Sequence, residues 1–230
     1  MKIIISPTKT MKRKNYIKDV SEPIFLEKSL FLRNILKTYN KEKIKKDFKV
    51  SDNLTEKVYE FYNNEKEPIA ALNLYEGLAF KSMDIALWDK SDFDFVNNHL
   101  LIMSAMYGLL SPSDAIIEYR LDYVMPFMHD LYDFWSKPIN DLLKDEDLII
   151  NLASLEFSKQ IDHPNMINMH FLDEKGRNLS TQAKKGRGDM LGYIVKNKIV
   201  DVKALKLYNN LDYKFRNDLS DKNNYYFSKE

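Results

Sequence analysis

The hydrophobic and polar positions of this chain follow two patterns, short unbroken apolar runs and apolar residues three or four positions apart. The apolar run at 2–5 predicts a buried strand that ends at a Ser-Pro pair. Leu26, Leu30 and Phe31 share one helical face and predict a helix over 26–39. The remaining expected elements are helices over 40–48, 52–63, 68–73, 92–98, 130–143, 154–160 and 184–196, strands over 99–104, 147–151, 166–172, 178–182, 204–209 and 225–227, a turn over 107–112 and a hairpin turn at 174–177.

Strands and helices are interleaved along the whole sequence. This order is typical of an α/β or α+β fold in which helices flank a mixed β-sheet. No Pro-, Gly- or Ser-rich linker divides the chain and no internal repeat is visible. We therefore predict that residues 1–230 form a single compact domain.

The composition and the apolar runs give no sign of a membrane-spanning segment or a signal peptide. The chain has no apolar run of about 18 residues, which a membrane-spanning helix needs. It has no cysteine, and its first apolar run is too short for a signal peptide. We expect a cytoplasmic protein with no membrane partner.

The charge balance excludes a uniformly basic nucleic-acid-binding protein. Lys and Arg total 35 and Asp and Glu total 34, a formal net charge of +1. Nucleic-acid binding would therefore need a local basic patch. Two stretches, 1–14 and 175–187, each carry five cations and no acid.

The second basic stretch contains unusual glycines. The chain has only six glycines, so their positions are informative. Gly186 and Gly188 alternate with Lys185 and Arg187 and follow Lys184 at the start of a predicted helix. Backbone N–H groups, the helix dipole and these cations together suit a phosphate, and glycine permits close backbone approach. A solvated basic turn is the alternative.

Polar residues follow two predicted strands. Ser6, Lys9 and Thr10 come after the first strand, and this pair of hydroxyls with an ammonium suits an anion. Asn151, a candidate catalytic residue, and Ser154, a candidate anion-binding residue, come at the end of a later strand, where α/β sheets commonly place their sites. The alternatives are an exposed loop for the first group and a helix N-cap for Ser154.

A third group surrounds a predicted strand exit at 103–112. Gly108 would allow backbone approach there, and Tyr107 would stack on a base. Glu118, or Asp114, is a candidate general acid or base, although Glu118 also has Arg120 close by as a structural ion-pair partner.

The sequence gives no sign of a metal centre. The four histidines, His99, His129, His163 and His170, show no metal-binding spacing, and no cysteine is available to assist them. We expect neither a metal nor a cofactor.

A series of short motifs over nearly the whole chain resembles the YaaA family, also called the peroxide stress resistance protein family. Only 11–70 matches poorly, and nothing is carried over there. The motifs are Ile-Ser-Pro-Thr-Lys-Thr at 5–10, Tyr75 with Gly77 and Leu78, and the segments 92–95, 103–112, 119–121, 131–135, 150–154, 171–174 and 183–188.

The resemblance implies a compact α/β domain with a positively charged cleft. It also implies DNA binding through a helix–hairpin–helix-like element, for which the residues around Gly108 are our candidate. A role in oxidative stress by limiting free intracellular iron is implied as well.

Two functions remain open. The first is a DNA-binding protein of the peroxide stress response, with phosphates held by Lys184, Lys185 and Arg187 and supported by Lys9 and Arg120. The second is an enzyme that acts on a nucleotide or nucleic-acid base in a basic pocket. The expected partner is therefore double-stranded DNA, another nucleic acid or a phosphate-bearing small molecule. The second function requires that the segments 6–10, 104–108, 151–154 and 184–187 converge.

Overall fold

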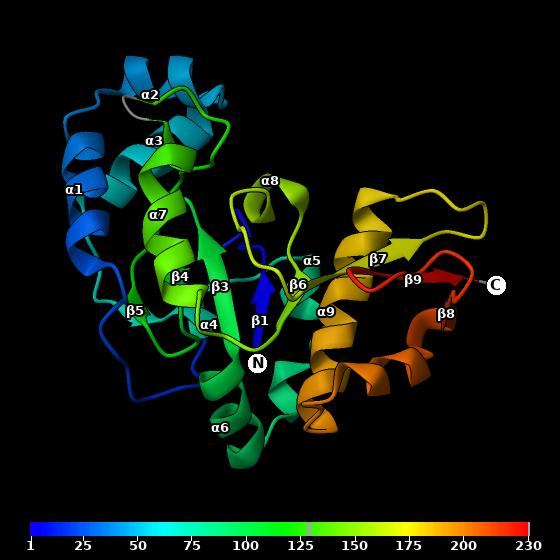
Figure 1. The fold of residues 1–230 in the computed structure, drawn as a ribbon. Coiled ribbons are helices and arrows are strands. Elements are labelled where there is room, and N and C mark those ends of the chain that lie inside the picture. Colours follow the sequence, from blue (N-terminus) through cyan, green and yellow to red (C-terminus); the bar gives the residue numbers. More distant parts are fainter. Residues whose placement is uncertain (128–129, 230) are drawn as a thin grey trace.

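A mixed sheet of seven strands, in the order β4-β3-β1-β6-β7-β9-β8, crosses the computed structural model, which describes residues 1–127 and 130–229 (Figure 1). Its strands are β1 (Lys2–Ile5), β3 (Leu100–Ser104), β4 (Gly108–Leu110), β6 (Ile149–Leu152), β7 (Met166–Leu172), β8 (Tyr213–Phe215) and β9 (Asn224–Lys229). Parallel pairs form the middle, and antiparallel β4 and β8 form the edges. A separate antiparallel pair joins β2 (Ile69–Ala70) to β5 (Ala115–Ile116). The predicted α/β class with a mixed, helix-flanked sheet is confirmed.

Strand β1 lies between β3 and β6 because its sequence cannot face water on either side. Ile3, Ile4 and Ile5 are each fully buried, and such a continuous apolar run is typical of a parallel strand covered on both faces. Ile5 is paired with Ile102 of β3 and with Leu152 of β6. The carboxyl ends of these parallel strands therefore meet at one sheet edge, where α/β folds form their binding crevices.

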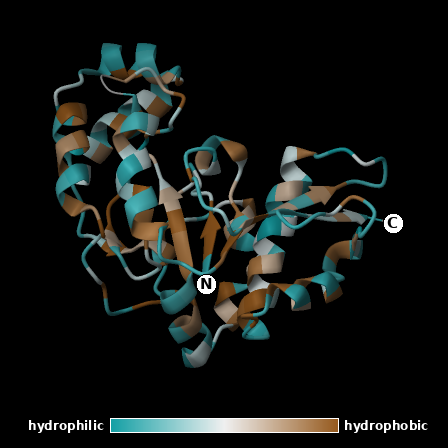
Figure 2. Cartoon of the chain, in the orientation of Figure 1, coloured by the Kyte–Doolittle hydropathy of each residue, from teal (hydrophilic) through white to brown (hydrophobic). Residues whose placement is uncertain are grey.

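Helices cover both faces of the sheet. They are α1 (Leu26–Lys37), α2 (Lys41–Phe48), α3 (Asp52–Asn63), α4 (Ala71–Leu74), α5 (Leu78–Lys81), α6 (Lys90–His99), α7 (Leu131–Leu143), α8 (Leu155–Ser158) and α9 (Ser180–Lys196), with 3₁₀ turns η1 (Ile85–Leu87), η2 (Val202–Leu207) and η3 (Asn210–Asp212). Figure 1 shows α1–α3 and α7 grouped beside the β3–β4 end, and α9 packs on β6 and β7. The central strands are hydrophobic and the outer helix surfaces are largely hydrophilic (Figure 2). Within 1–127 and 130–229, no helix combines the length and apolar content that a membrane span requires.

Four local predictions were wrong. The segment 68–73 begins as β2 before it enters α4, and the predicted turn at 107–112 contains β4, which returns on β3. The segment 178–182 is not a strand, because α9 already begins at Ser180. The segment 204–209 is mostly η2, which the Asp201 side chain caps by accepting the N–H of Lys203.

The early start of α9 follows from a tight turn after β7. The Asp173 carboxylate accepts the N–H groups of Lys175 and Arg177, and Gly176 has a φ of +72°. This turn is the one predicted at 174–177. It directs the chain away from the sheet, so the next residues enter a helix instead of pairing with β7.

The candidate glycines approach the protein's own elements and not a free surface. A Cβ on Gly188 would lie 1.9 Å from the carbonyl oxygen of Ala79, and one on Gly186 would lie 2.4 Å from the Phe171 ring. Helix α9 therefore rests directly on α5 and β7. Both glycines lie inside α9 and not in a turn at its start, so the expectation that their N–H groups cradle a phosphate was wrong.

The close contact at Gly188 predicts a stability effect. Gly188→Ala should lower the thermal unfolding midpoint, because its Cβ forces α5 and α9 apart, an overpacking cost of about 1–3 kcal/mol. Circular dichroism melting measures this effect. The matched control is Lys185→Ala, at an exposed position of the same helix. Since alanine favours a helix over glycine by about 1 kcal/mol, equal or higher stability of Gly188→Ala would contradict the packing argument.

Candidate functional site

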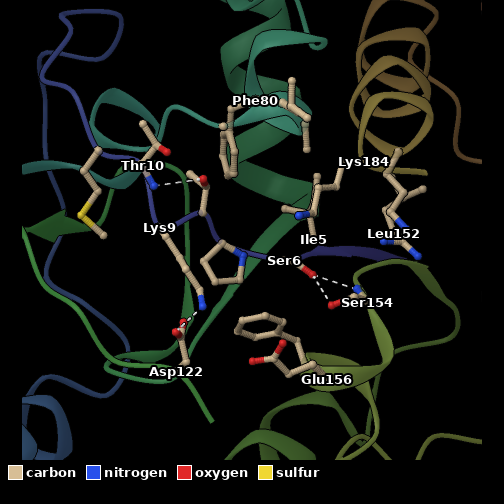
Figure 3. Close-up of a pocket in the computed structure, with 18 of the residues that line it drawn as sticks. Ile5, Ser6, Lys9, Thr10, Phe80, Asp122, Leu152, Ser154, Glu156 and Lys184 are labelled. Atoms are coloured by element: carbon tan, nitrogen blue, oxygen red, sulfur yellow. Dashed lines mark hydrogen bonds and ion pairs between the residues drawn. The ribbon is translucent and has the colours of Figure 1, made fainter. Parts of the chain in front are cut away.

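A cavity of about 350 Å³ opens at the carboxyl ends of β1 and β6 (Figure 3). Segments that are far apart in the sequence meet there. The lining is formed by residues 5–11, 77–80 and 119–122, by Leu152, Ser154, Glu156 and Phe157, and by Lys184 and Arg187 of α9. Three of the four segments expected to converge therefore contribute to one cavity. The fourth, 104–108, lies behind the wall, where the Ser104 hydroxyl is 2.8 Å from that of Tyr119.

Two serines join the loops that leave β1 and β6. The Ser154 N–H donates to Ser6 Oγ at 2.8 Å, and Ser6 Oγ in turn donates to Ser154 Oγ at 3.3 Å (Figure 3). Ser154 precedes α8, but its side chain makes no capping hydrogen bond. Its hydroxyl serves the cavity edge, so the simple N-cap interpretation does not account for it.

Asn151 supports this edge from behind. Its side chain donates to Asn168 Oδ1 at 2.7 Å and accepts the N–H of Ala153 at 2.8 Å. The residue is 4% exposed and is not part of the cavity wall. The structure therefore gives this catalytic candidate a shaping role in the loop after β6.

Two of the predicted cations share one carboxylate. Lys9 Nζ lies 2.5 Å from Asp122 Oδ2 as an ion pair (Figure 3). Arg120 Nε lies 4.0 Å from the same oxygen. Neither Arg120 Nε nor Asp122 Oδ2 has the geometry of a hydrogen bond, although both atoms are buried. Thr10 lies in the same loop as Lys9, and its N–H donates to Thr8 Oγ1 at 3.2 Å.

Arg187 is a cavity cation whose Nε is buried without a partner in the described residues. Burial lowers the pKa of its guanidinium. A guanidinium removed from water without an acceptor is costly, and an anion in the cavity would offset that cost. Its planar donors suit a phosphate or a carboxylate.

Helix geometry separates the other two cations of this segment. At about 100° per residue, Lys184 lies on nearly the same face as Arg187, whereas Lys185 points away. Lys184 lines the cavity and is exposed, and Lys185 is exposed outside it. The three cations expected to act as one cradle therefore divide into two that face the cavity and one that faces the surroundings.

Glu156 is an acidic residue of the cavity lining that lies outside the motifs identified in the sequence. Its Oε1 is buried and has no hydrogen-bond partner within the described residues. Desolvation, and then the negative charge of Asp122, raise the pKa of the Glu156 carboxyl. Asp122 and Glu156 each follow a selected motif by one or two residues. That adjacency was the signal by which they could have been found.

The acids proposed from the sequence for acid–base chemistry are structural. Glu118 accepts two hydrogen bonds from Arg13, at 3.0 and 2.9 Å, and one from Lys66 at 3.3 Å. Burial alone would raise the pKa of Glu118, but these partners outweigh it and lower the pKa to about 2. Asp114 accepts the Ser21 hydroxyl and the Ser111 N–H, both at 2.8 Å. Neither acid lines the cavity, so this assignment was wrong.

The hairpin around Gly108 belongs to the core. Tyr107 is 5% exposed, packs edge-on against Tyr119 and accepts the Ile117 N–H, so it offers no free face to a base. Gly108 has a φ of +71°, and a Cβ there would lie 2.7 Å from the Trp135 ring. Residues 105–110 are all buried, and so this hairpin is not a surface element for DNA.

Acids from other parts of the chain neutralise most of the first basic stretch, where Lys9 pairs with Asp122, Arg13 with Glu118 and Lys14 with Glu76. In the second stretch the ion pair found in the described residues is that of Arg177 with the nearby Asp173. The cavity itself holds four cations and two carboxylates. The basic cleft implied by the resemblance stays a prediction, and it would depend chiefly on the cations of α9.

His129 lies outside the described residues. Among the residues that are described, no group of three or more histidine, aspartate or glutamate side chains is arranged to hold a metal ion.

Comparison with known proteins agrees with the resemblance seen in the motifs. The sequence model for the family described as peroxide stress protein YaaA matches residues 1–219. A UPF0246 protein of Fusobacterium nucleatum is 32% identical over all of this chain and 99% of its own. UPF0246 proteins of Agathobacter rectalis and Clostridioides difficile are each 33% identical over all of this chain and over 99% and 100% of theirs. The family expected from the motifs is thereby confirmed.

The structural role of Glu118 predicts a pH-dependent stability. The pKa is lowered from 4.5 to about 2, so Glu118 stabilises the fold above pH 4.5 and this contribution is lost as the pH falls towards 2. Glu118→Gln should lower the free energy of unfolding by about 2–3 kcal/mol at pH 7, and the gap should narrow at acid pH. Urea unfolding at several pH values measures it. Glu174→Gln, at an exposed acid, is the control; a gap that is constant with pH would refute the assignment.

Proposed function

We propose that this chain, which belongs to the peroxide stress protein YaaA family, binds nucleic acid and holds one nucleotide of it in the cavity. The family assigns the chain to the peroxide stress response. The observation that carries the proposal is the partly buried Arg187 side chain, whose buried Nε has no acceptor in the described part of the chain and which lines a cavity at the carboxyl ends of two parallel strands. That position is where α/β sheets bind nucleotides.

The phosphate of the nucleotide would be held by α9. Arg187 supplies a planar set of donors, and Lys184 adds a second charge from the same helical face. Lys9 and Arg120 already neutralise Asp122, and so they are less available to a ligand. The anion therefore belongs at the α9 side of the cavity.

The rest of the cavity suits the flat, less polar part of a nucleotide. Phe80, Phe157 and Pro7 add apolar side chains to the cavity lining. A volume of about 350 Å³ lies within the usual range for small-ligand sites, roughly 300–1,000 Å³. In duplex DNA a nucleotide would have to leave the stack to enter, at a cost of a few kcal/mol.

Lys185 would contact the nucleic acid outside the cavity. It is exposed and next to a cavity cation, so it can meet a neighbouring phosphate of the same strand. This contact is absent for a free mononucleotide. The iron-limiting role implied by the resemblance is a cellular outcome of such binding in our proposal, and none of the cavity residues is assigned to iron.

The proposal predicts different effects for neighbouring cations. Arg187→Ala should weaken binding of a nucleoside monophosphate at least about tenfold. It should also weaken binding of duplex DNA, because both ligands make the same contact in the cavity. Lys185→Ala should leave mononucleotide affinity unchanged and reduce the salt dependence of DNA binding by one phosphate contact, a log–log slope change of about 0.9. Calorimetry with mononucleotides and fluorescence anisotropy with labelled duplex across a salt series measure both.

The controls separate charge from folding. Arg187→Lys keeps the charge but loses the planar donors, and it should retain part of the affinity. Thermal melting of each variant shows whether it is folded. Equal mononucleotide affinity of wild type and Arg187→Ala, or DNA affinity that does not change with salt, would reject the proposed function.

A further inference from the structure

We propose that Glu156 and Asp122 form an acid–base pair that hydrolyses the bond between base and sugar of the nucleotide held in the cavity. This inference rests on the proposed function for its ligand and adds an activity to it. It rests on two carboxylates in one cavity wall, one buried without a hydrogen-bond partner in the described residues and the other held in an ion pair. Figure 3 shows both on the side of the cavity away from Phe80.

The surroundings of the Glu156 carboxyl favour its protonated form. It lies in the first turn of α8, two residues after Ser154, whose N–H and hydroxyl join the two strand ends. Its Oε1 is buried without a hydrogen-bond partner in the described residues, an unfavourable place for a charged oxygen. Desolvation and the charge of Asp122 raise the pKa of this carboxyl. A carboxylic acid that stays neutral can donate its proton to a leaving group.

Asp122 has a different environment. Lys9 lies 2.5 Å from its Oδ2 as an ion pair, and Arg120 lies 4.0 Å from the same atom. Glu156 Oε1, in contrast, has no hydrogen-bond partner in the described residues. We therefore assign the role of proton donor to Glu156 and that of anion to the ion-paired Asp122.

The charges around Glu156 come from four elements. Asp122 raises its pKa, whereas Lys9 from the loop after β1, Lys159 after α8 and Lys184 of α9 lower it. Lys159 also lies over the Tyr132 ring, 3.6 Å from its centroid. An anion seated on Lys184 would cancel part of the lowering effect, and so ligand binding would favour the protonated acid.

This pair fits the cleavage of a glycosidic bond. The bond from C1′ to the base nitrogen breaks, its electron pair goes to that nitrogen, and the nitrogen takes the Glu156 proton. Positive charge that develops at C1′ is stabilised by the Asp122 carboxylate. Water then bonds to C1′ and gives its proton to Asp122. The products are the free base and the sugar phosphate, and proton exchange with solvent restores both acids.

The test measures base release and binding on the same samples. Wild type, Glu156→Gln and Asp122→Asn are incubated with the nucleoside 5′-monophosphates and with end-labelled single-stranded and duplex oligonucleotides. Free base is measured by chromatography, and abasic sites by alkaline strand cleavage. Glu174→Gln, at an exposed acid outside the cavity, is the matched control. Calorimetry gives the affinity of each variant, and melting confirms folding.

We expect wild type and Glu174→Gln to release base, and Glu156→Gln to bind at least as tightly as wild type, because its side chain stays neutral, but react at least about 100-fold more slowly. The wild-type rate should fall as pH rises through the pKa of Glu156, because the proton donor is lost, and this limb should be absent in Glu156→Gln. Binding without any base release would overturn the acid–base pair and leave the proposed function intact. Base release that is unaffected in Glu156→Gln would overturn the assignment, and absence of binding to every probe would overturn both.

Discussion

The site depends on how closely helix α9 approaches its neighbours. Gly188 lies against the Ala79 backbone, so α9 contacts the backbone of α5 directly, and Gly186 lies against the Phe171 ring of β7. Residues two apart on a helix point in nearly opposite directions, at about 200°. Arg187, between the two glycines, therefore faces the space between α5 and the sheet. Packing, and not any local partner, holds its guanidinium in the cavity wall.

The sheet supplies the other half of this constraint. Because β1 is buried on both faces and paired in parallel with β6, the loops that follow both strands leave the same edge. The hydrogen bonds between Ser6 and Ser154 then fix the distance between these loops. A floor of strand ends and a wall formed by α9 together enclose a volume that the chain's own side chains do not fill.

The parts of this site that follow from neighbouring residues could be predicted from the sequence. An apolar run followed by Ser6 or by Ser154 identifies a strand end, and parallel strand ends share an edge. Lys184 and Arg187 were also found, but a strand was expected where α9 begins. The helix predicted over 184–196 already contained both, and the spacing of three residues places them on one face and Lys185 on another. The boundary error had a different effect: it placed these residues at the start of a helix, where they resembled one phosphate cradle.

Partners that are distant in sequence could not be derived in this way. Glu118 looked like a free acid near Arg120, yet its charge is satisfied by Arg13 and Lys66, from segments that only the fold brings together. Likewise, Lys9 looked available to a ligand until Asp122 was placed beside it. A stretch of sequence shows only the charges within it, whereas the acids that pair with its cations are brought there by the tertiary structure. Acid-free stretches therefore overestimated the basic surface.

Lys184 connects anion binding to the acid chemistry of the cavity. Lys184 serves two groups, since it is available to a ligand phosphate and also lowers the pKa of Glu156. A phosphate that binds Lys184 withdraws this influence, so the proton on Glu156 is held more firmly in the complex than in the free protein. By linkage, protonation of Glu156 must favour the anion to the same extent. The cations beside Asp122, Lys9 and Arg120, come from other elements, and a phosphate on Lys184 leaves them in place. Occupation of the cavity would therefore strengthen the proton on Glu156 while the ion pair of Asp122 is kept, at the moment when a proton donor and an anion are both needed.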